Sequence, residues 1–430
     1  MQRIEIENFG PIKNVAFDIK DYTVFIGPQA SGKSTITRAI NYFTSLRNNL
    51  HKNMLDTSDF SLDEWGNMSV NEFCSYWDSS YFQKNGSLKF FFDDTKFVSV
   101  RVNPDGITLD ASDTFKTEIT DGIVAVQTLL KDIDFPIKLL ESQFGSLASL
   151  WVSKIKLQAR NTEYAFVNNY IPAGRSVFLN LRNELAPNMA PFNDILVSRF
   201  IGEANVIRHE LSKIPVEMRL KQMSDTTPPS TFVRQAEKMR QYALLILNGE
   251  YRQIDKKDYI LVDSTAIPIG LSSSGQQESL WILLYAQFYL MILAKYEQVN
   301  HRCFQLFTLI EEPEAHLFPE SQKHMMSVLT LLANTNKNRL MLTTHSPYIL
   351  TPLNNLLLAH HIGQNKREAV EKIIDPDLWI DPDRFECYYV DHGTINSVMD
   401  RNTGMIDLAG LDAVSGTLND QYDQLTELED

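Results

Sequence analysis

A glycine-rich segment near the start of the chain has the residue types needed to hold phosphate. Residues 24–40 read VFIGPQASGKSTITRAI, and Gly27, Gly32, Lys33 and Ser34 match the pattern G-x-x-x-x-G-K-[ST]. An apolar run precedes the pattern and a helix-like segment follows it, which is the setting that a phosphate-binding loop requires. Glycines let backbone N–H groups turn toward phosphate oxygens, and the helix presents its positive end to them. We therefore expect ATP to contact the loop residues Gly27, Pro28, Gln29, Ala30, Ser31, Gly32, Lys33, Ser34 and Thr35.

Two side chains of this loop have expected roles beyond binding. Lys33 is expected to reach the β- and γ-phosphates and to support catalysis, and the hydroxyl of Ser34 is expected to ligate Mg²⁺. The alternative is a plain glycine turn with an exposed lysine, which does not account for the strand and helix on either side.

A pair of carboxylates follows a second apolar run. Residues 304–310 read FQLFTLI, and Glu311 and Glu312 come directly after them. Acidic side chains at the carboxyl end of a buried strand beside a phosphate loop lie where Mg²⁺ and an attacking water are needed. We expect Glu311 to bind Mg²⁺ through water and Glu312 to orient or deprotonate the nucleophilic water. A solvated acidic turn is the alternative.

A serine-rich loop and a histidine complete the set of candidate residues. Residues 271–278 read LSSSGQQE and open the apolar helix expected over 280–293, so they form a second potential anion site. An ordinary helix N-cap explains this loop equally well. His345 follows the apolar run RLMLTT of residues 339–344.

The remaining pattern predicts the elements that position these residues. Residues 3–7 alternate polar and apolar side chains, and Asn8 to Pro11 form a turn before a second strand over 15–19. Strand patterns over 87–102 and 107–109 predict an antiparallel β-subsheet, and residues 251–269 predict a hairpin. Helical spacing dominates residues 122–160 and 176–248, and a late strand is expected over 386–390. The acidic, amphipathic segment 405–425 either packs on the core or docks a partner.

Composition limits the class of protein. The 430 residues are 43% hydrophobic and carry a net charge of −14, which argues against non-specific coating of nucleic acid. The three cysteines are widely spaced, as in a reducing compartment. The N-terminus lacks the pattern of a signal peptide, and no apolar run is long enough to cross a membrane. We expect a cytoplasmic protein with no membrane partner.

Taken together, these motifs resemble those of ABC-type ATPases of the RecF and chromosome-maintenance kind. The resemblance rests on NFGPI at 8–12, the phosphate loop, the serine-rich loop and the acidic pair, and the E-E-P-E-x-H-L form resembles the OLD-type branch. It implies that Ser273, Ser274, Gly275 and Gln276 form a signature loop that binds the γ-phosphate held by the other subunit. Ser274 departs from the family pattern, which has glycine there.

The same resemblance suggests roles for three further segments. It implies that His345 is the switch histidine that touches the γ-phosphate, and that Glu314 to Leu317 communicate between subunits. It places Asn8 to Ile12 at the adenine, although a plain strand turn explains them too. Arg175 in YIPAGR faces phosphate, a carboxylate of another subunit or an internal ion pair. Gln143 and Gln158 are both candidates for a Mg²⁺-sensing glutamine.

The expected fold is α/β: a P-loop NTPase of ABC-ATPase type with a mixed central sheet, an antiparallel β-subdomain and a helical lobe insertion. We expect a first ATPase lobe over 1–175, the helical lobe over 176–250, the signature loop, acidic pair and histidine over 251–350, and a C-terminal extension of the core over 351–430.

The resemblance implies an Mg²⁺-dependent ATPase that works as a homodimer through shared ATP sites, with higher oligomers left open. The chain after His345 is too short for the Toprim nuclease domain of OLD-type relatives. We therefore expect a separate effector, a nuclease or toxin, as with stand-alone ATPase subunits of bacterial anti-phage defence. One alternative is a RecF-like DNA-repair ATPase with a basic stripe; the other is a transporter nucleotide-binding subunit. The stripe would comprise Arg199, Arg208, Lys213, Arg219, Lys221, Arg234, Lys238 and Arg240.

Overall fold

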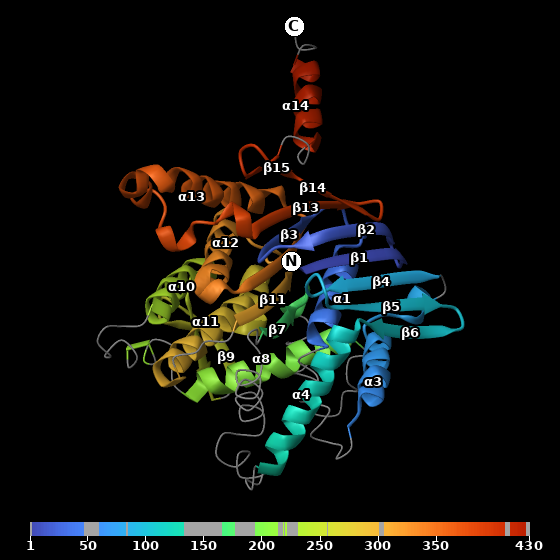
Figure 1. Ribbon diagram of the computed structural model, residues 1–430. Helices are drawn as coiled ribbons and strands as arrows, with labels where there is room; N and C mark the ends of the chain where they lie inside the picture. Colours follow the sequence, from blue (N-terminus) through green and yellow to red (C-terminus); the bar gives the residue numbers. More distant parts are fainter. Residues whose placement is uncertain are drawn as a thin grey trace.

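The protein is described by a computed structural model, shown in Figure 1. The described residues are 2–46, 60–82, 85–132, 166–176, 194–213, 218, 220–221, 231–255, 257–300, 305–408 and 413–426. Gln143, Gln158, Cys303 and Arg219 lie outside them.

The central sheet positions the phosphate loop, the acidic pair and His345, which lie at the ends of β3, β11 and β12. Its strand order is β14-β13-β3-β12-β11-β7, and all neighbours are parallel except β13 and β14. Parallel strands are covered on both faces, which explains their continuous apolar runs. Because their carboxyl ends share one edge, the loops after β3, β11 and β12 meet there. The strands are β3 (Tyr22–Ile26), β7 (Phe166–Ile171), β11 (Gln305–Glu311), β12 (Arg339–Thr344), β13 (Phe385–Asp391) and β14 (Thr394–Ser397).

An antiparallel sheet with the order β2-β1-β4-β5-β6 packs beside the central one. Alternate residues of its strands are buried, as the period-2 pattern predicts. An aromatic-rich core, including Phe9, Phe43 and Phe90, fills the space between this sheet and α1 (Lys33–Ser45). The strands are β1 (Gln2–Phe9), β2 (Ile12–Ile19), β4 (Gly86–Phe91), β5 (Phe97–Asn103) and β6 (Gly106–Ala111), and the flanking helices are α3 (Leu62–Ser75) and α4 (Asp113–Asp132).

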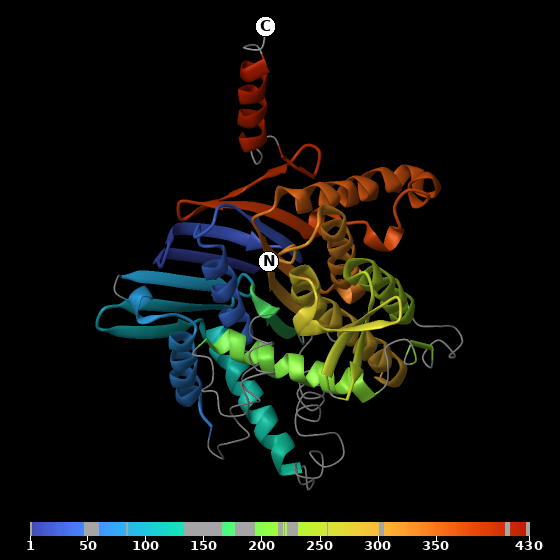
Figure 2. The same cartoon turned by 180° about the vertical axis from the view of Figure 1, so that it is seen from behind.

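Helices cover the other side of the molecule. Figures 1 and 2 show the antiparallel sheet on one side and α8, α10, α11 and α12 on the opposite side. Their apolar side chains form one core with the central sheet. The helices are α8 (Ile195–Lys213), α10 (Thr231–Leu247), α11 (Ser274–Asn300), α12 (Pro319–Asn334) and α13 (Leu350–Glu371). Single 3-10 turns are η1 (Ser79–Phe82), η2 (Ile269–Leu271), η3 (Thr335–Lys337), η4 (Pro347–Ile349), η5 (Pro376–Leu378) and η6 (Pro382–Arg384).

Several elements differ from the sequence expectation. The expected hairpin is a three-stranded sheet of β8 (Glu250–Ile254), β9 (Lys257–Val262) and β10 (Thr265–Pro268). Helix α11 begins at Ser274 rather than near Leu280, because Ser273 caps it. The segment expected as one amphipathic stretch contains β16 (Met405–Ile406), paired with β15 (Met399–Asp400), and α14 (Ala413–Thr426).

The predicted fold class is confirmed: the chain is an α/β protein with a mixed central sheet, an antiparallel β-subdomain and a helical lobe. The predicted domain boundaries stay predictions. Within the described residues, no helix combines the length and the apolar character that a membrane crossing requires.

Candidate functional site

The phosphate loop is fixed by two glycines that other residues could not replace. The loop leaves β3 and enters α1, whose N-cap Gly32 has φ 105°, in the left-handed region that favours glycine. A Cβ on Gly27 would lie 2.1 Å from the carbonyl oxygen of Val390 in β13. The glycines of the pattern therefore serve the backbone path of the loop and its contact with the neighbouring strand.

Lys33 points back into this loop. Its Nζ donates to the carbonyl oxygens of Gly27 at 2.8 Å and Pro28 at 2.7 Å, and lies 3.4 Å from Ser31 Oγ. Burial lowers the pKa of Lys33 from 10.5 to about 8, although the carboxylates of Glu312, Glu314 and Glu311 oppose the shift. The two carbonyl oxygens that Lys33 contacts are neutral. A phosphate group bound in the loop would give its ammonium group a negatively charged partner.

Lys33, His345 and Glu312 form a chain of polar contacts. Lys33 Nζ lies 3.4 Å from His345 Nδ1, and His345 Nε2 lies 3.2 Å from Glu312 Oε1. Since Lys33 carries only protons to donate, Nδ1 is the acceptor, which leaves the proton on Nε2 facing Glu312. The structure thus brings together three residues that lie far apart in the sequence.

Glu312 has a strained backbone. Its φ of 44° is in the left-handed region, where a residue with a Cβ costs about 1–3 kcal/mol. Its N–H donates to Thr343 O at 2.9 Å, and its side chain is 39% exposed. This conformation turns the carboxylate out of the strand toward His345 and solvent, as a residue that handles a water molecule requires.

Glu311 and Ser34 have the chemistry of magnesium ligands. Glu311 Oε2 accepts from the backbone N–H of Ala173 at 3.2 Å, whereas its Oε1 is buried without a hydrogen-bond partner. Ser34 is exposed at the first turn of α1. Mg²⁺ keeps several waters and needs only one or two carboxylates, so an unsatisfied carboxylate oxygen and an exposed hydroxyl have the chemistry that this ion needs. No group of three or more His, Cys, Asp or Glu side chains suited to a metal occurs among the described residues.

Sequence reasoning missed the role of Glu314, which positions the histidine. Its Oε1 accepts from Thr344 Oγ1 at 2.6 Å and from the backbone N–H of His345 at 3.2 Å. Burial raises the pKa of Glu314. The carboxylate therefore joins the turn after β11 to the end of β12.

Arg175 makes an internal network, which settles the three alternatives left by the sequence. The side chain is completely buried, and it donates to the carbonyl oxygens of Pro172, Glu311, Glu312 and Glu278 at 2.9 to 3.1 Å. Its Nε also lies 3.4 Å from Glu278 Oε2. The only hint in the sequence was an arginine directly after a strand that ends in YIPAG.

The signature loop forms a helix cap on the surface. Ser273 N–H and Oγ both donate to Gln276 Oε1, at 3.0 and 3.1 Å, and Gln276 N–H donates back to Ser273 Oγ at 3.3 Å. Ser273 and Ser274 are exposed, whereas Gly275 is buried against the turn after Glu314. A Cβ on Gly275 would lie 2.6 Å from His316 O. The loop therefore contacts that turn through Gly275 and the end of α10 through Gln276, whose Nε2 donates to Leu247 O at 2.6 Å.

The turn between β1 and β2 lies over the phosphate loop. A Cβ on Gly32 would lie 2.4 Å from Ile12 Cδ1 and 3.4 Å from Pro11 Cγ. Tyr81 OH lies 3.4 Å from Thr35 Oγ1. Pro11 and Ile12 therefore border the phosphate loop, and Tyr81 is a neighbour that the sequence did not indicate.

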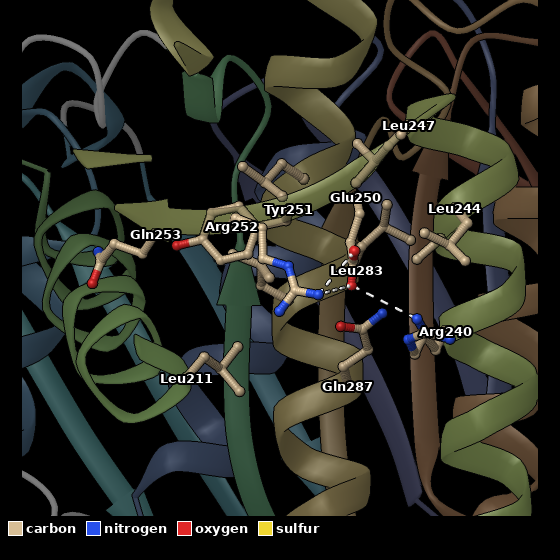
Figure 3. Close-up of a pocket in the computed structure, with 14 residues that line it drawn as sticks. Leu211, Arg240, Leu244, Leu247, Glu250, Tyr251, Arg252, Gln253, Leu283 and Gln287 are labelled. Carbon is tan, nitrogen blue, oxygen red and sulfur yellow. Dashed lines mark hydrogen bonds and ion pairs between the residues drawn. The ribbon is translucent and has the colours of Figure 1, made fainter. Parts of the chain in front are cut away.

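A separate hollow lies between α8, α10, α11 and β8 (Figure 3). Its polar centre is Glu250, which accepts from Arg252 at 3.0 Å and lies 3.7 Å from Arg240. Leu211 and Leu283 belong to its apolar wall. It shares no residue with the phosphate loop, the acidic pair or His345.

Comparison with known families decides the class of the protein. Residues 1–350 match the model of the AAA ATPase domain. The chain belongs to the AAA ATPase domain family. The phosphate loop, the signature loop, the acidic pair and His345 all lie within the matched residues of this ATPase, so the ATPase recognition made from the motifs is confirmed.

Solved structures of low sequence identity align with most of this ATPase. The crystal structure of the SmcHead bound to the C-winged helix domain of ScpA aligns at 13% identity and TM-score 0.42, covering 92% of this chain and 96% of that chain. The SMC head domain from Thermotoga maritima aligns at 12% identity and TM-score 0.34, with 81% and 90% covered. The recombination mediator protein RecF-ATPrS aligns at 12% identity and TM-score 0.33, with 92% and 97% covered. No curated protein matches the chain.

Proposed function

We propose that this ATPase is of the ABC type and hydrolyses ATP at a site shared between two copies of the chain. One copy supplies the phosphate loop, Glu311, Glu312 and His345, and the other supplies Ser273 and Gly275. ATP then holds the two copies together, and hydrolysis releases them.

The observation that carries this proposal is the character of the surface around the motifs. A large apolar side chain is exposed next to each of three motifs: Leu271 at 80%, Phe318 at 76% and Tyr348 at 65%. Leu271 precedes the signature loop, Phe318 follows the turn after Glu314, and Tyr348 follows His345. Single exposed apolar residues are common, but here each of the three motifs has one beside it in the sequence, which supports a partner surface at the motifs. A second copy would cover them while bringing its own signature loop to the nucleotide.

The residues at the sheet edge account for in-line attack of water on the γ-phosphate. Glu312 would accept a proton from the water, and His345, whose Nε2 faces Glu312, would orient the water and the phosphate. Lys33 would exchange its two carbonyl contacts for phosphate oxygens. Mg²⁺, held by Ser34 and by Glu311 through water, would neutralise charge on the phosphates. Because the reaction needs positioning and electrostatics rather than covalent chemistry, these groups suffice.

We infer that the product of the cycle is a conformational change that regulates a separate effector, a nuclease or toxin, in bacterial anti-phage defence. The support is the resemblance of the motifs to such stand-alone ATPases. A cytoplasmic location belongs to the same proposal. Nuclease activity in the purified chain alone would contradict the separate effector.

The shared site is tested with Glu312→Gln, which keeps the shape of Glu312 but removes the base. In ATP and Mg²⁺ this variant should accumulate as a dimer in light scattering, while the wild-type chain returns to monomer as ATP is consumed. Lys33→Ala with ATP is the control that should stay monomeric. A Glu312→Gln chain that binds ATP and remains monomeric would refute the shared site.

A RecF-like DNA-binding ATPase is the second candidate. The structure shows the partners of three cations in the basic stripe that this candidate requires. Arg199 pairs with Glu72 at 2.6 Å, Arg208 with Asp258 at 2.6 Å, and Lys238 with Asp375 at 2.6 Å. These cations already have carboxylate partners, so they are poorly suited to bind phosphate. Tight DNA binding that weakens steeply with salt would nevertheless favour this candidate.

A further inference from the structure

We propose that Arg175 is a positioning residue that couples the first two turns of α11, which begins in the signature loop, to the backbone of Glu312. The inference rests on the shared-site function proposed above and adds a route between the two sites of the dimer. A signature loop that engages the nucleotide of the partner would act, through Arg175, on the Glu312 of its own chain.

Two nitrogens of the Arg175 guanidinium donate hydrogen bonds to the end of β11. Its Nη1 donates to Glu311 O at 2.9 Å, and its Nη2 donates to Glu312 O at 3.1 Å. These are the carbonyl groups of the two residues expected to handle Mg²⁺ and water. Since Glu312 has a left-handed backbone, a donor on its carbonyl oxygen helps to hold the peptide in that orientation.

The third nitrogen of the Arg175 guanidinium contacts α11. Its Nε donates to Glu278 O at 2.9 Å and lies 3.4 Å from Glu278 Oε2. Glu278 lies in the first turns of α11, five residues after Ser273, and Ser176 Oγ donates to its Oε1 at 2.5 Å. A shift or tilt of α11 therefore changes the contacts of the same guanidinium that holds Glu312.

The contacts of Arg175 are better suited to passing a movement of α11 to Glu312 than to stabilising the fold alone. A buried ion pair contributes little net stability, because desolvation offsets the attraction between the charges. A planar guanidinium can bind several carbonyl oxygens at fixed angles, which a lysine cannot do. Three of the four hydrogen bonds of Arg175 go to backbone carbonyls of α11 and of the end of β11, and the fourth goes to Pro172 O.

The test compares Arg175→Lys with Arg208→Lys, a matched change in another arginine–carboxylate pair that lies away from the site. Arg175→Lys should lower kcat about tenfold and leave the affinity for a fluorescent ATP analogue within about twofold. Arg208→Lys should change neither. Equal kcat values for the two variants would overturn the proposal.

A double-mutant cycle with Ser273→Ala tests the route itself. If the signal passes through Arg175, Ser273→Ala should lower kcat several-fold in the wild-type chain and hardly at all in Arg175→Lys. Effects that simply multiply would show that Arg175 has only a structural role.

Two further measurements keep the outcomes distinguishable. If Arg175→Lys unfolds, Glu278→Gln is measured in its place, because it removes the charge that faces Arg175 Nε and leaves the four carbonyl contacts of Arg175 intact. It should lower kcat at a retained melting temperature, and an unchanged kcat would overturn the proposal. The dimer of Glu312→Gln is the reference for the shared site. Its absence refutes the proposed function, whereas its presence together with an additive cycle refutes the route through Arg175 alone.

Discussion

At the scale of single residues, Lys33 has hydrogen-bond partners within the protein that bound nucleotide is expected to replace. Lys33 has two backbone carbonyls and a histidine nitrogen in place of phosphate oxygens. Burial has brought its pKa to about 8, close to the physiological range. Its charge is therefore sensitive to pH in a way that an exposed lysine is not.

Binding of ATP should weaken as pH rises above about 8, because neutral Lys33 no longer attracts phosphate. The dissociation constant measured by fluorescence titration should rise by up to about tenfold per pH unit. Lys33→Ala should bind weakly and show no such dependence. A flat profile in the wild-type chain would contradict the shift.

The lowered pKa of Lys33 also affects stability. Whereas ATP binding should weaken as pH rises, the contribution of Lys33 to folding becomes less unfavourable. Between about pH 8 and pH 10.5 the unfolded chain holds a proton on Lys33 that the folded chain lacks. The unfavourable contribution of Lys33 to folding is therefore complete below about pH 8 and fades as pH rises through this interval. Lys33→Met should raise the melting temperature at neutral pH and have less effect near pH 10.5.

Glu314 allows a prediction about the histidine. Glu314→Ala removes the acceptor for Thr344 Oγ1 and His345 N–H, so His345 loses its fixed position. We expect kcat to fall about ten- to a hundredfold, with the affinity for ATP unchanged. Glu314→Gln keeps an acceptor oxygen and should retain most activity. Equal losses in both variants would mean that the charge, and not the position of His345, is what matters.

At the scale of elements, the signature loop and the turn after β11 behave as one surface. Gly275 packs against His316 O so closely that a methyl group does not fit. The start of α11 is therefore located by the turn that follows Glu311 and Glu312.

Gly275→Ala should displace the start of α11 from the turn at His316. Overpacking of this kind typically costs about 1–3 kcal/mol, and ATP-dependent dimerisation should weaken with it. Gly270→Ala is the matched control, because nothing lies within 4 Å of a Cβ at that position. Thermal unfolding and light scattering should separate the two variants; the same behaviour in both would contradict the packing argument.

Local patterns predicted most elements, and tertiary contacts explain the rest. The strands beside Gly27, Glu311 and His345 could be identified because parallel strands are continuously apolar. The early start of α11 was missed because the capping by Ser273 looked the same as a phosphate-binding loop. The contacts of Arg175 and Glu314 could not be predicted, since their partners lie on other elements and depend on how β7, β11 and β12 align. The roles of the site residues stay predictions.

At the scale of the whole molecule, the last part of the chain contributes to the central sheet and then leaves it. Strand β13 pairs with β3 in parallel, from Phe385 opposite Tyr22 to Tyr389 opposite Ile26. Helix α14 instead projects from the body in Figure 1, and Tyr422 and Leu425 are 70% and 64% exposed.

Removal of residues 413–430 should therefore leave the melting temperature and the ATPase rate unchanged. Truncation before residue 385 should abolish folding, because it removes a strand that borders β3. Calorimetry and a phosphate-release assay check both truncated proteins. A large loss of stability in the shorter deletion would show that α14 packs on the body.

The contact between Gly27 and Val390 has a consequence for how the protein is made. The phosphate loop is synthesised long before the strand that borders it, because β13 follows it at a great distance along the chain. Pairings between such distant segments form late in folding. A nascent chain therefore cannot complete the packing around its phosphate loop until β13 has been translated.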